Sequence, residues 1–144
     1  MNYAKLLGSD CAFFLFNTFS HVSNTGNLVS PLSCTFKKYH IVIIKPDIIC
    51  STAHIFSSLK IKENTTSLLL DDSELLDLNH LKNDLESVAF SLYPQLKEIK
   101  NYFYDLGAVY VSMTGSGSAI YGLFDNQPTI KNYSQFWIWQ GKLG

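Results

Sequence analysis

The 144-residue sequence lacks the features that would assign it at once to a nucleic-acid-binding, membrane or secreted class. Basic residues do not outnumber acidic ones: 11 Lys and Arg stand against 12 Asp and Glu, so nothing favours binding to a phosphate backbone. The longest uncharged apolar run, residues 11–16, is far shorter than the roughly 20 residues of a bilayer-spanning helix. No charged segment followed by an apolar one opens the chain, so we expect no secretory signal. These absences predict a protein that binds neither nucleic acid nor a membrane.

Cysteine is also scarce, which limits disulfide and metal chemistry. The three cysteines (Cys11, Cys34 and Cys50) are isolated, and none forms a CxxC motif. This argues against a disulfide framework and a zinc site, and favours the reducing cytoplasm. The four histidines have neither HxxxH nor HExxH spacing, so we expect no metal site built from them.

What is present is the pattern of an α+β protein, with 47% apolar and 16% charged residues. Apolar or β-branched runs predict strands, and apolar stripes at helical spacing predict helices. The expected strands are 11–16, 40–45, 108–113, 119–124 and 136–140. The expected helices are 2–7, 52–59, 81–92 and 94–106, with a further short helix after Pro128. Residues 17–35 are polar and interrupted by Gly26 and Pro31, and 60–77 are expected to be a loop with some helix. This order predicts helices on one face of a mainly antiparallel sheet, as in a ferredoxin-like two-layer sandwich.

The Gly-rich segment between two expected strands is the first candidate site. It consists of Thr114, Gly115, Ser116, Gly117 and Ser118. Two glycines let the backbone approach a ligand and turn N–H groups toward an anion, and the three hydroxyls add donors. The alternative is a plain hairpin connection, which glycines also serve. The segment is not a Walker loop, because no GK[ST] follows it.

Three other segments carry weaker signals. Asp10, between an expected helix end and an apolar run, could accept a proton or orient a hydroxyl, but taken alone it is more simply a turn or capping aspartate. Ser51 and Thr52 could line a pocket, or simply N-cap a helix. Residues 83–86 (Asn-Asp-Leu-Glu) are most simply an acidic cluster in the first turn of a helix.

Taken in order, several segments resemble a known family. They are Leu7-Gly8-Ser9-Asp10-Cys11-Ala12-Phe13-Phe14-Leu15, Lys45-Pro46, Ser51-Thr52-Ala53, Asn83-Asp84-Leu85-Glu86, Met113-Thr114-Gly115-Ser116-Gly117-Ser118-Ala119 and Trp139-Gln140-Gly141-Lys142-Leu143. The series is similar to the C-terminal half of the GHMP-type small-molecule kinases. Among them it most resembles the members that act on a cytidyl-erythritol diphosphate in non-mevalonate isoprenoid synthesis. The resemblance implies that 39–144 is the C-terminal kinase domain and that 1–38 belongs to the N-terminal one.

The resemblance also implies roles for individual residues. Asp10 matches the active-site aspartate, and 114–118 match the third family motif, a Gly-rich loop beside the phosphates. Ser51 and Thr52 match a segment near the active site, on the substrate side. The implied reaction transfers the ATP γ-phosphoryl group, with Mg²⁺, to the 2-hydroxyl of the substrate, chemistry that depends on positioning and charge stabilisation.

The sequence departs from the family pattern in ways that affect activity. Residues 1–144 contain no counterpart of the family's N-terminal lysine or of its main phosphate loop, of the Pro-x-x-x-Gly-Leu-Gly-Ser-Ser-Ala type. The family's Gly-x-Gly-Glu turn is replaced by Asn24-Thr25-Gly26-Asn27. Because groups that bear transition-state charge are missing, we expect little or no kinase activity from these residues alone.

Two alternatives remain open at this point. One is a different GHMP kinase, such as a homoserine or mevalonate-pathway enzyme. The other is a non-catalytic α+β interaction domain. Such a domain would expose surface that once packed on a missing N-terminal half, with Leu6, Phe13, Phe14 and Phe16 as candidates, and would self-associate through it.

Overall fold

The fold is that of a computed structural model, which describes residues 8, 11–16, 18–24, 26, 28–32, 39–59, 78 and 81–143. The chain divides into two compact units. The first comprises 1–35 with 68–76, and the second comprises 36–67 with 77–144. Within the described ranges, no helix is both long enough and apolar enough to cross a membrane. The expected helix at 2–7 and the irregular segment at 60–77 lie outside the described residues.

The first unit begins with helix α2 (Cys11–Phe16), where the apolar run predicts a strand. That prediction is wrong. A six-residue apolar run does not distinguish strand from helix, and here the Cys11 N–H donates to the Gly8 carbonyl, 3.2 Å away, at the start of a helical turn. Phe14 and Leu15 are exposed, whereas Phe13 and Phe16 are half-buried. Leu6, the other candidate for exposed apolar surface, lies outside the described residues.

The same unit contains a hairpin in the polar segment 17–35, for which the sequence predicts no strand. Strand β1 (Ser20–Ser23) pairs antiparallel with β2 (Leu28–Pro31). Asn24 and Gly26 adopt positive φ angles of 59° and 86° in the connection, a conformation that favours these two residue types. The turn residues therefore mark a tight reversal rather than a long loop.

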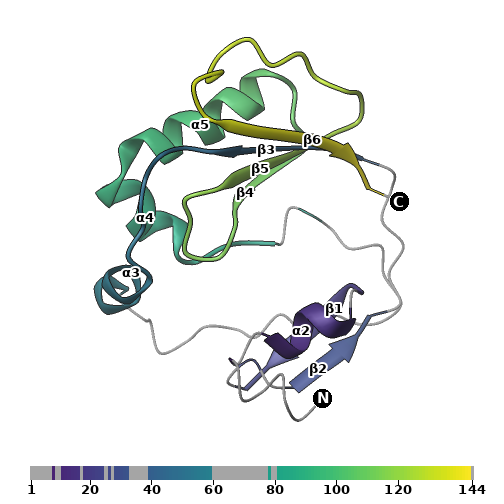
Figure 1. The fold of residues 1–144 in the computed structure, drawn as a ribbon, viewed down its shortest axis with the longest axis vertical. Coiled ribbons are helices and arrows are strands. Elements are labelled where there is room, and N and C mark those ends of the chain that lie inside the picture. Colours follow the sequence, from purple (N-terminus) through teal and green to yellow (C-terminus); the bar gives the residue numbers. More distant parts are fainter. Residues whose placement is uncertain are drawn as a thin grey trace. The chain divides into compact units, whose positions relative to one another are not determined.

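The second unit is built on a four-stranded antiparallel sheet of order β4-β5-β3-β6 (Figure 1). Its strands are β3 (His40–Lys45), β4 (Tyr110–Met113), β5 (Ile120–Phe124) and β6 (Trp137–Lys142). All four lie within a few residues of the predicted strands, and Pro46 follows β3 directly. Ile44 pairs with both Ile120 and Ile138, so β3 is central, while β4 and β6 form the edges.

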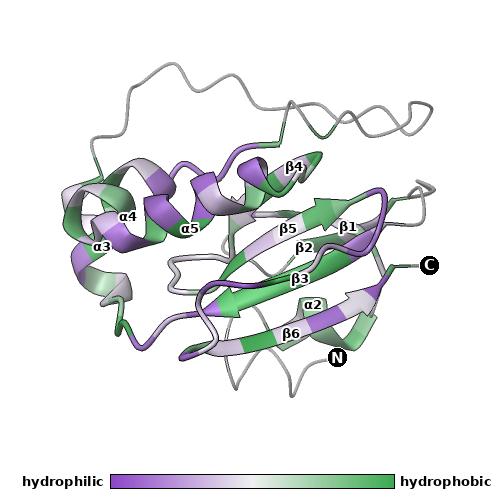
Figure 2. Cartoon of the chain, turned by 90° about the horizontal axis from the view of Figure 1, so that it is seen from above, coloured by the Kyte–Doolittle hydropathy of each residue, from purple (hydrophilic) through white to green (hydrophobic). Residues whose placement is uncertain are grey.

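The described part of this unit also contains helices α3 (Thr52–Ser58), α4 (Glu86–Leu92) and α5 (Pro94–Asp105). Helices α4 and α5 lie on one face of the sheet (Figures 1 and 2). Helix α5 begins at Pro94 and ends before Gly107, which has a φ of 88°. The Ala108 N–H then donates to the Phe103 carbonyl at 3.0 Å, the longer hydrogen bond of a Schellman ending. The sequence predicts both ends of this helix, through Pro94 at its start and Gly107 after its end.

The core forms between these helices and the sheet. Its buried residues are Val42, Ile44, Ile55, Ala89, Leu96, Ile99, Phe103, Val111, Met113, Ile120 and Phe124. Figure 2 shows the same division, with β3 strongly hydrophobic and α5 alternating between polar and apolar residues. At Gly122, a Cβ atom would lie 3.1 Å from the Phe103 ring. The absence of a side chain there lets α5 pack directly against the sheet.

Two details differ from the expectation. Helix α4 begins at Glu86 instead of Leu81, because the preceding residues bond to β4: the Tyr110 hydroxyl donates to the Leu81 carbonyl at 3.3 Å. The short helix expected after Pro128 is absent from 125–136, all of which are described. The α+β class and the antiparallel sheet are confirmed, whereas the ferredoxin-like detail is not.

Candidate functional site

The Gly-rich segment forms a tight connection between β4 and β5. The Thr114 N–H donates to the Ala119 carbonyl at 2.9 Å, and the Gly117 N–H donates to the Thr114 carbonyl at 2.8 Å. Gly115 and Gly117 have φ angles of 51° and 92°, which L residues rarely adopt. The segment is thus the hairpin connection that the sequence allowed, and the positive φ angles favour glycine at both positions.

One side of this loop is open. A Cβ atom on Gly115 would meet nothing within 4 Å, whereas one on Gly117 would lie 2.9 Å from the Met113 Sδ and 3.2 Å from the Cys50 Sγ. Among the described residues, the N–H groups of Gly115 and Ser116 donate no hydrogen bond. Free amides in a turn of this kind form a concave site for an anion. The loop therefore has its packed side at Gly117 and its accessible amides at Gly115 and Ser116.

The start of α3 reaches the same loop. The hydroxyl oxygens of Thr52 and Ser116 lie 2.8 Å apart, within hydrogen-bonding distance. Ser51 instead acts as the N-cap, its hydroxyl accepting a hydrogen bond from the His54 N–H at 3.3 Å. Two segments singled out separately in the sequence, 51–52 and 114–118, thus meet at one place.

Ser118 has a different environment from the other loop hydroxyls. It is buried, and its Oγ donates to the Pro46 carbonyl at 3.3 Å. This bond ties the end of the loop to the residue that follows β3. The hydroxyls that remain exposed or half-exposed toward a ligand are those of Thr114 and Ser116.

Asn83 holds the loop from outside the hairpin. Its Nδ2 donates to the Met113 carbonyl at 2.9 Å and to the Gly115 carbonyl at 2.7 Å. Its Oδ1 accepts a hydrogen bond from the Leu85 N–H at 3.0 Å. Nothing in the sequence signals the long-range contacts, although an asparagine shortly before a helix is a signal for the local one.

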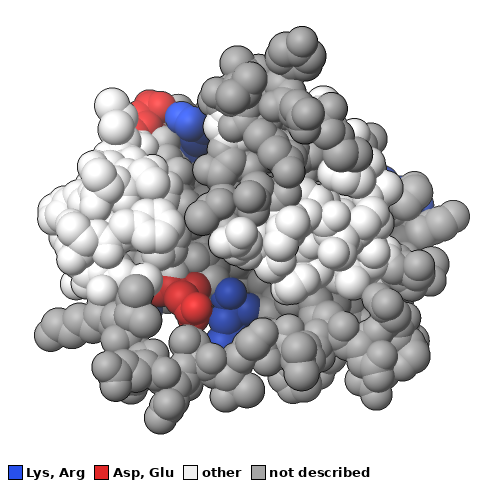
Figure 3. All heavy atoms as spheres, turned by 90° about the horizontal axis from the view of Figure 1, so that it is seen from below, with Lys and Arg blue, Asp and Glu red and all other residues white. Residues whose placement is uncertain are grey.

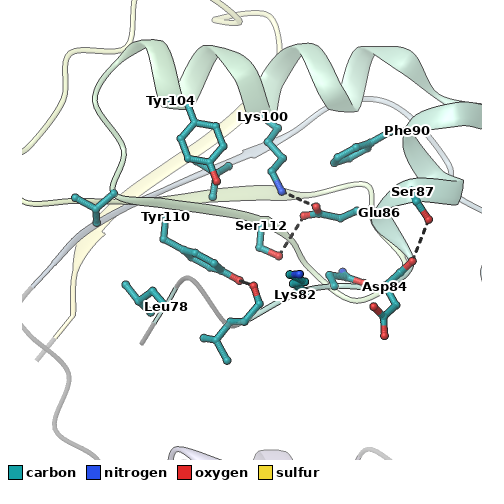
Figure 4. A pocket seen from close by; sticks show the side chains of 14 residues that line it. Leu78, Lys82, Asp84, Glu86, Ser87, Phe90, Lys100, Tyr104, Tyr110 and Ser112 are labelled. Atoms are coloured by element: carbon teal, nitrogen blue, oxygen red, sulfur yellow. Dashed lines mark hydrogen bonds and ion pairs between the residues drawn. The ribbon is translucent and has the colours of Figure 1, made fainter. Parts of the chain in front are cut away.

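Glu86, the first residue of α4, joins three elements. Its Oε1 accepts hydrogen bonds from the Met113 N–H at 2.8 Å and from the Ser112 Oγ at 3.2 Å. Its Oε2 pairs with the Lys100 Nζ at 2.5 Å. Figure 4 shows Lys100 approaching from α5 and Ser112 from β4. The interpretation of 83–86 as an acidic first-turn cluster is therefore incomplete, because the carboxylate serves β4 and α5.

A cavity of about 540 Å³ lies beside this network, lined in part by Lys82, Asn83, Glu86, Lys100 and Tyr104 (Figure 4).

On the surface drawn in Figure 3, acidic and basic residues lie next to one another, and most described atoms are uncharged. That face therefore carries no broad patch of one sign among its described residues.

Burial alters the acidity of two groups near the site. It raises the pKa of the Cys50 thiol, which lies against Gly117, so this cysteine stays protonated at neutral pH. Burial, followed by the neighbouring Tyr110, raises the pKa of Tyr121 well above its usual value of 10.0. Neither group is a nucleophile at neutral pH.

The remaining predicted site residue, Asp10, lies outside the described residues. Within the part of the chain that is described, no group of three or more His, Cys, Asp or Glu side chains could hold a metal ion. The described candidate site therefore consists of 114–118 and Thr52, together with Asn83 and Glu86 of the segment 83–86, whose contacts with the loop the sequence did not indicate.

Residues 68–137 match the family model for the C-terminal domain of GHMP kinases, the family that the motifs predict. The α+β class and the Gly-rich hairpin beside the start of α3 agree with this match.

The curated relatives narrow the class further. The chain is 40% identical over 135 residues to the 4-diphosphocytidyl-2-C-methyl-D-erythritol kinase of Bacteroides thetaiotaomicron, covering 89% of this chain and 47% of that one. It is 34% identical over 149 residues to the same-named kinase of Parabacteroides distasonis, covering 97% and 54%. A solved structure of 4-(cytidine 5'-diphospho)-2C-methyl-D-erythritol kinase superposes with a TM-score of 0.76 at 26% identity, covering 97% of this chain and 55% of the other. The chain spans about half the length of these relatives.

Proposed function

We propose that this chain supplies the C-terminal part of a kinase that phosphorylates the 2-hydroxyl of 4-diphosphocytidyl-2-C-methyl-D-erythritol with ATP. The relatives that share most of this chain carry that kinase's name. The observation that carries the proposal is the open loop 114–118, in which the Gly115 and Ser116 amides donate no hydrogen bond to any described residue and beside which Thr52 lies. In this proposal 39–144 form the C-terminal kinase domain, and 1–38 belong to the N-terminal one. The free thiols of Cys11 and Cys50 support a cytoplasmic location.

Phosphoryl transfer needs charge stabilisation and positioning more than covalent help from the protein. The amides of Gly115 and Ser116 would donate to phosphate oxygens of ATP, and the Thr114 and Ser116 hydroxyls would add donors. Asp10 would position the substrate hydroxyl. It would take the hydroxyl proton while the hydroxyl oxygen forms a bond to the γ-phosphorus. The bond between that phosphorus and the bridging oxygen of ADP breaks in the same step.

Mg²⁺ accompanies ATP in this proposal, and the described residues contain no group of three or more His, Cys, Asp or Glu side chains that could hold it. The ion would be held by the phosphates and by residues beyond those described. We therefore assign no step to a metal ligand of this chain. The counterparts of the family lysine and main phosphate loop are absent from 1–144, so we expect these residues to bind ATP weakly and to turn over little or no substrate.

The test is a titration of the isotope-labelled chain with MgATP, followed by the cytidyl substrate, using backbone amide NMR shifts. We expect the Gly115 and Ser116 amides to move, and the cytidyl substrate to bind where homoserine and mevalonate do not. Gly115→Ala places a methyl group on the open side and should weaken MgATP binding several-fold. Gly107→Ala is the matched control, since Gly107 also has positive φ and open space around its Cβ position. The proposal fails if no amide within 114–118 responds to MgATP. Self-association without nucleotide binding would favour the interaction domain instead.

A further inference from the structure

The backbone at the start of the Gly-rich loop is held from outside by two side chains of one short segment. Asn83 donates to the carbonyls of Met113 and Gly115, and Glu86 accepts from the N–H of Met113. Both polar groups of Met113 and the carbonyl two residues later are therefore bonded to residues 83–86. We call this pair, Asn83 and Glu86, the clamp.

The clamp lies at the edge of the sheet, where backbone groups of β4 would otherwise have no hydrogen-bond partner. Strand β4 is the edge of the sheet, paired on one side with β5 only. The Met113 backbone groups that point away from β5 are the ones that Asn83 and Glu86 bond. Two side chains thus take the role of a neighbouring strand at the point where β4 becomes the loop.

The clamp residues are themselves fixed. The Asn83 Oδ1 accepts from the Leu85 N–H at 3.0 Å, which leaves its amide group aimed at the loop. Glu86 is 14% exposed and bonds both Lys100 and Ser112. Side chains restrained in this way hold a site in position with little loss of conformational freedom.

Peptide geometry connects the clamp to the anion-binding amides. The Gly115 carbonyl and the Ser116 N–H belong to one planar trans peptide, so they point in opposite directions. Glycine at 115 would allow this peptide to rotate and present its carbonyl to the open side. The 2.7 Å bond from Asn83 to that carbonyl favours the orientation in which the Ser116 N–H faces away from Asn83.

We infer that Asn83 and Glu86 are positioning residues for phosphate binding: they fix the loop so that the Ser116 amide, and not the Gly115 carbonyl, faces the nucleotide. The claim that the Ser116 amide faces a nucleotide rests on the proposed function. The claim that Asn83 and Glu86 order and orient the loop does not depend on any ligand.

Asn83→Asp tests the inference with little change of shape. The variant keeps an oxygen for the Leu85 N–H but replaces the amide donor with a carboxylate facing two carbonyls. Asn101→Asp, on an exposed position of α5, is the matched control with the same change of charge. Amide exchange and shifts are measured by NMR at a temperature where every variant is fully folded, so that global stability does not contribute.

In Asn83→Asp we expect the Gly117 amide, which closes the loop turn, to exchange at least tenfold faster, because the variant loses both hydrogen bonds from Asn83 to the loop and one hydrogen bond alone is worth up to about a factor of ten. The Ser116 amide shift should move, and MgATP should bind about tenfold more weakly. Asn101→Asp should change none of these. If Gly117 exchange and the Ser116 shift match those of the parent chain, the inference is overturned.

Two results separate this inference from the proposed function. If MgATP moves no loop amide in the parent chain, the proposed function fails, while the exchange data still decide whether the clamp orders the loop. If MgATP binds the parent and Asn83→Asp equally well, the positioning role fails and the proposed function stands. Should Asn83→Asp not fold, the Asn83 side-chain amide of the parent decides. It should exchange at least tenfold more slowly than that of Asn101, and equal rates would overturn the inference.

Discussion

Replacing Gly117 by alanine should destabilise the second unit more than the same change at Gly115. Both residues have positive φ, which costs an L residue about 1–2 kcal/mol. Only Gly117 has neighbours at its Cβ position: the Met113 Sδ at 2.9 Å and the Cys50 Sγ at 3.2 Å. Met113 is 2% exposed and packed in the core, so its sulfur can move only by disturbing other side chains. Overpacking of this kind costs about 1–3 kcal/mol, for a total of about 2–5 kcal/mol.

The comparison of the two variants isolates the packing contribution. The effect of Gly→Ala on the unfolded chain is common to both and cancels. The assay is urea unfolding followed by tryptophan fluorescence, which reports on the sheet because both tryptophans, Trp137 and Trp139, lie in β6. With a slope of about 1–3 kcal/mol per molar, the midpoints should differ by about 1 M at unchanged slope. Equal midpoints would refute the reasoning, because the Met113 sulfur would then yield without cost.

Three further changes probe other contacts of the site. Thr52→Val removes the hydroxyl that meets Ser116 and should lower the free energy of unfolding by about 0.5–1 kcal/mol. Thr52→Ser keeps the hydroxyl and should retain the stability of the parent chain. Equal losses in both variants would contradict the assigned hydrogen bond. Lys100→Met leaves the Glu86 carboxylate without its cation and should cost about 1–3 kcal/mol by urea unfolding, whereas Lys100→Arg should cost less than half as much. Similar losses in the two variants would show that the positive charge at this position does not stabilise the fold. Because the pKa of Tyr121 is raised in the folded state, the native protein keeps this proton after the unfolded chain has lost it, so stability falls as pH rises past 10.0. Tyr121→Phe should flatten the decline of the melting temperature above that pH, and an unchanged decline would exclude this tyrosine as its source.

Local signals predicted the second unit well. Pro94 and Gly107 mark the two ends of α5, and Ser51 caps α3, because each of these residues acts through its own backbone or its nearest neighbours. The apolar run at 11–16 failed as a predictor, since periodicity over six residues does not separate helix from strand.

The candidate site was predictable only in part. The Gly-Ser loop and Thr52 stood out by composition, and the structure brings them together. The segment 83–86 is part of the family resemblance, but the contacts of Asn83 and Glu86 could not be predicted, because their partners, Met113 and Lys100, are 30 and 14 residues away. A side chain's partner at that distance depends on how β4 and α5 pack, which no local pattern encodes.

The carboxylate of Glu86 also affects how the chain behaves toward other molecules. An exposed edge strand can recruit a strand from a second molecule through its unpaired backbone groups, which is a route to aggregation. At the loop end of β4, Glu86 occupies the Met113 N–H and Asn83 occupies its carbonyl. To pair there, a strand from a second molecule would have to displace both side chains and leave the Glu86 carboxylate without its hydrogen-bond partners. The residues that order the loop therefore also close this end of the sheet to intermolecular pairing.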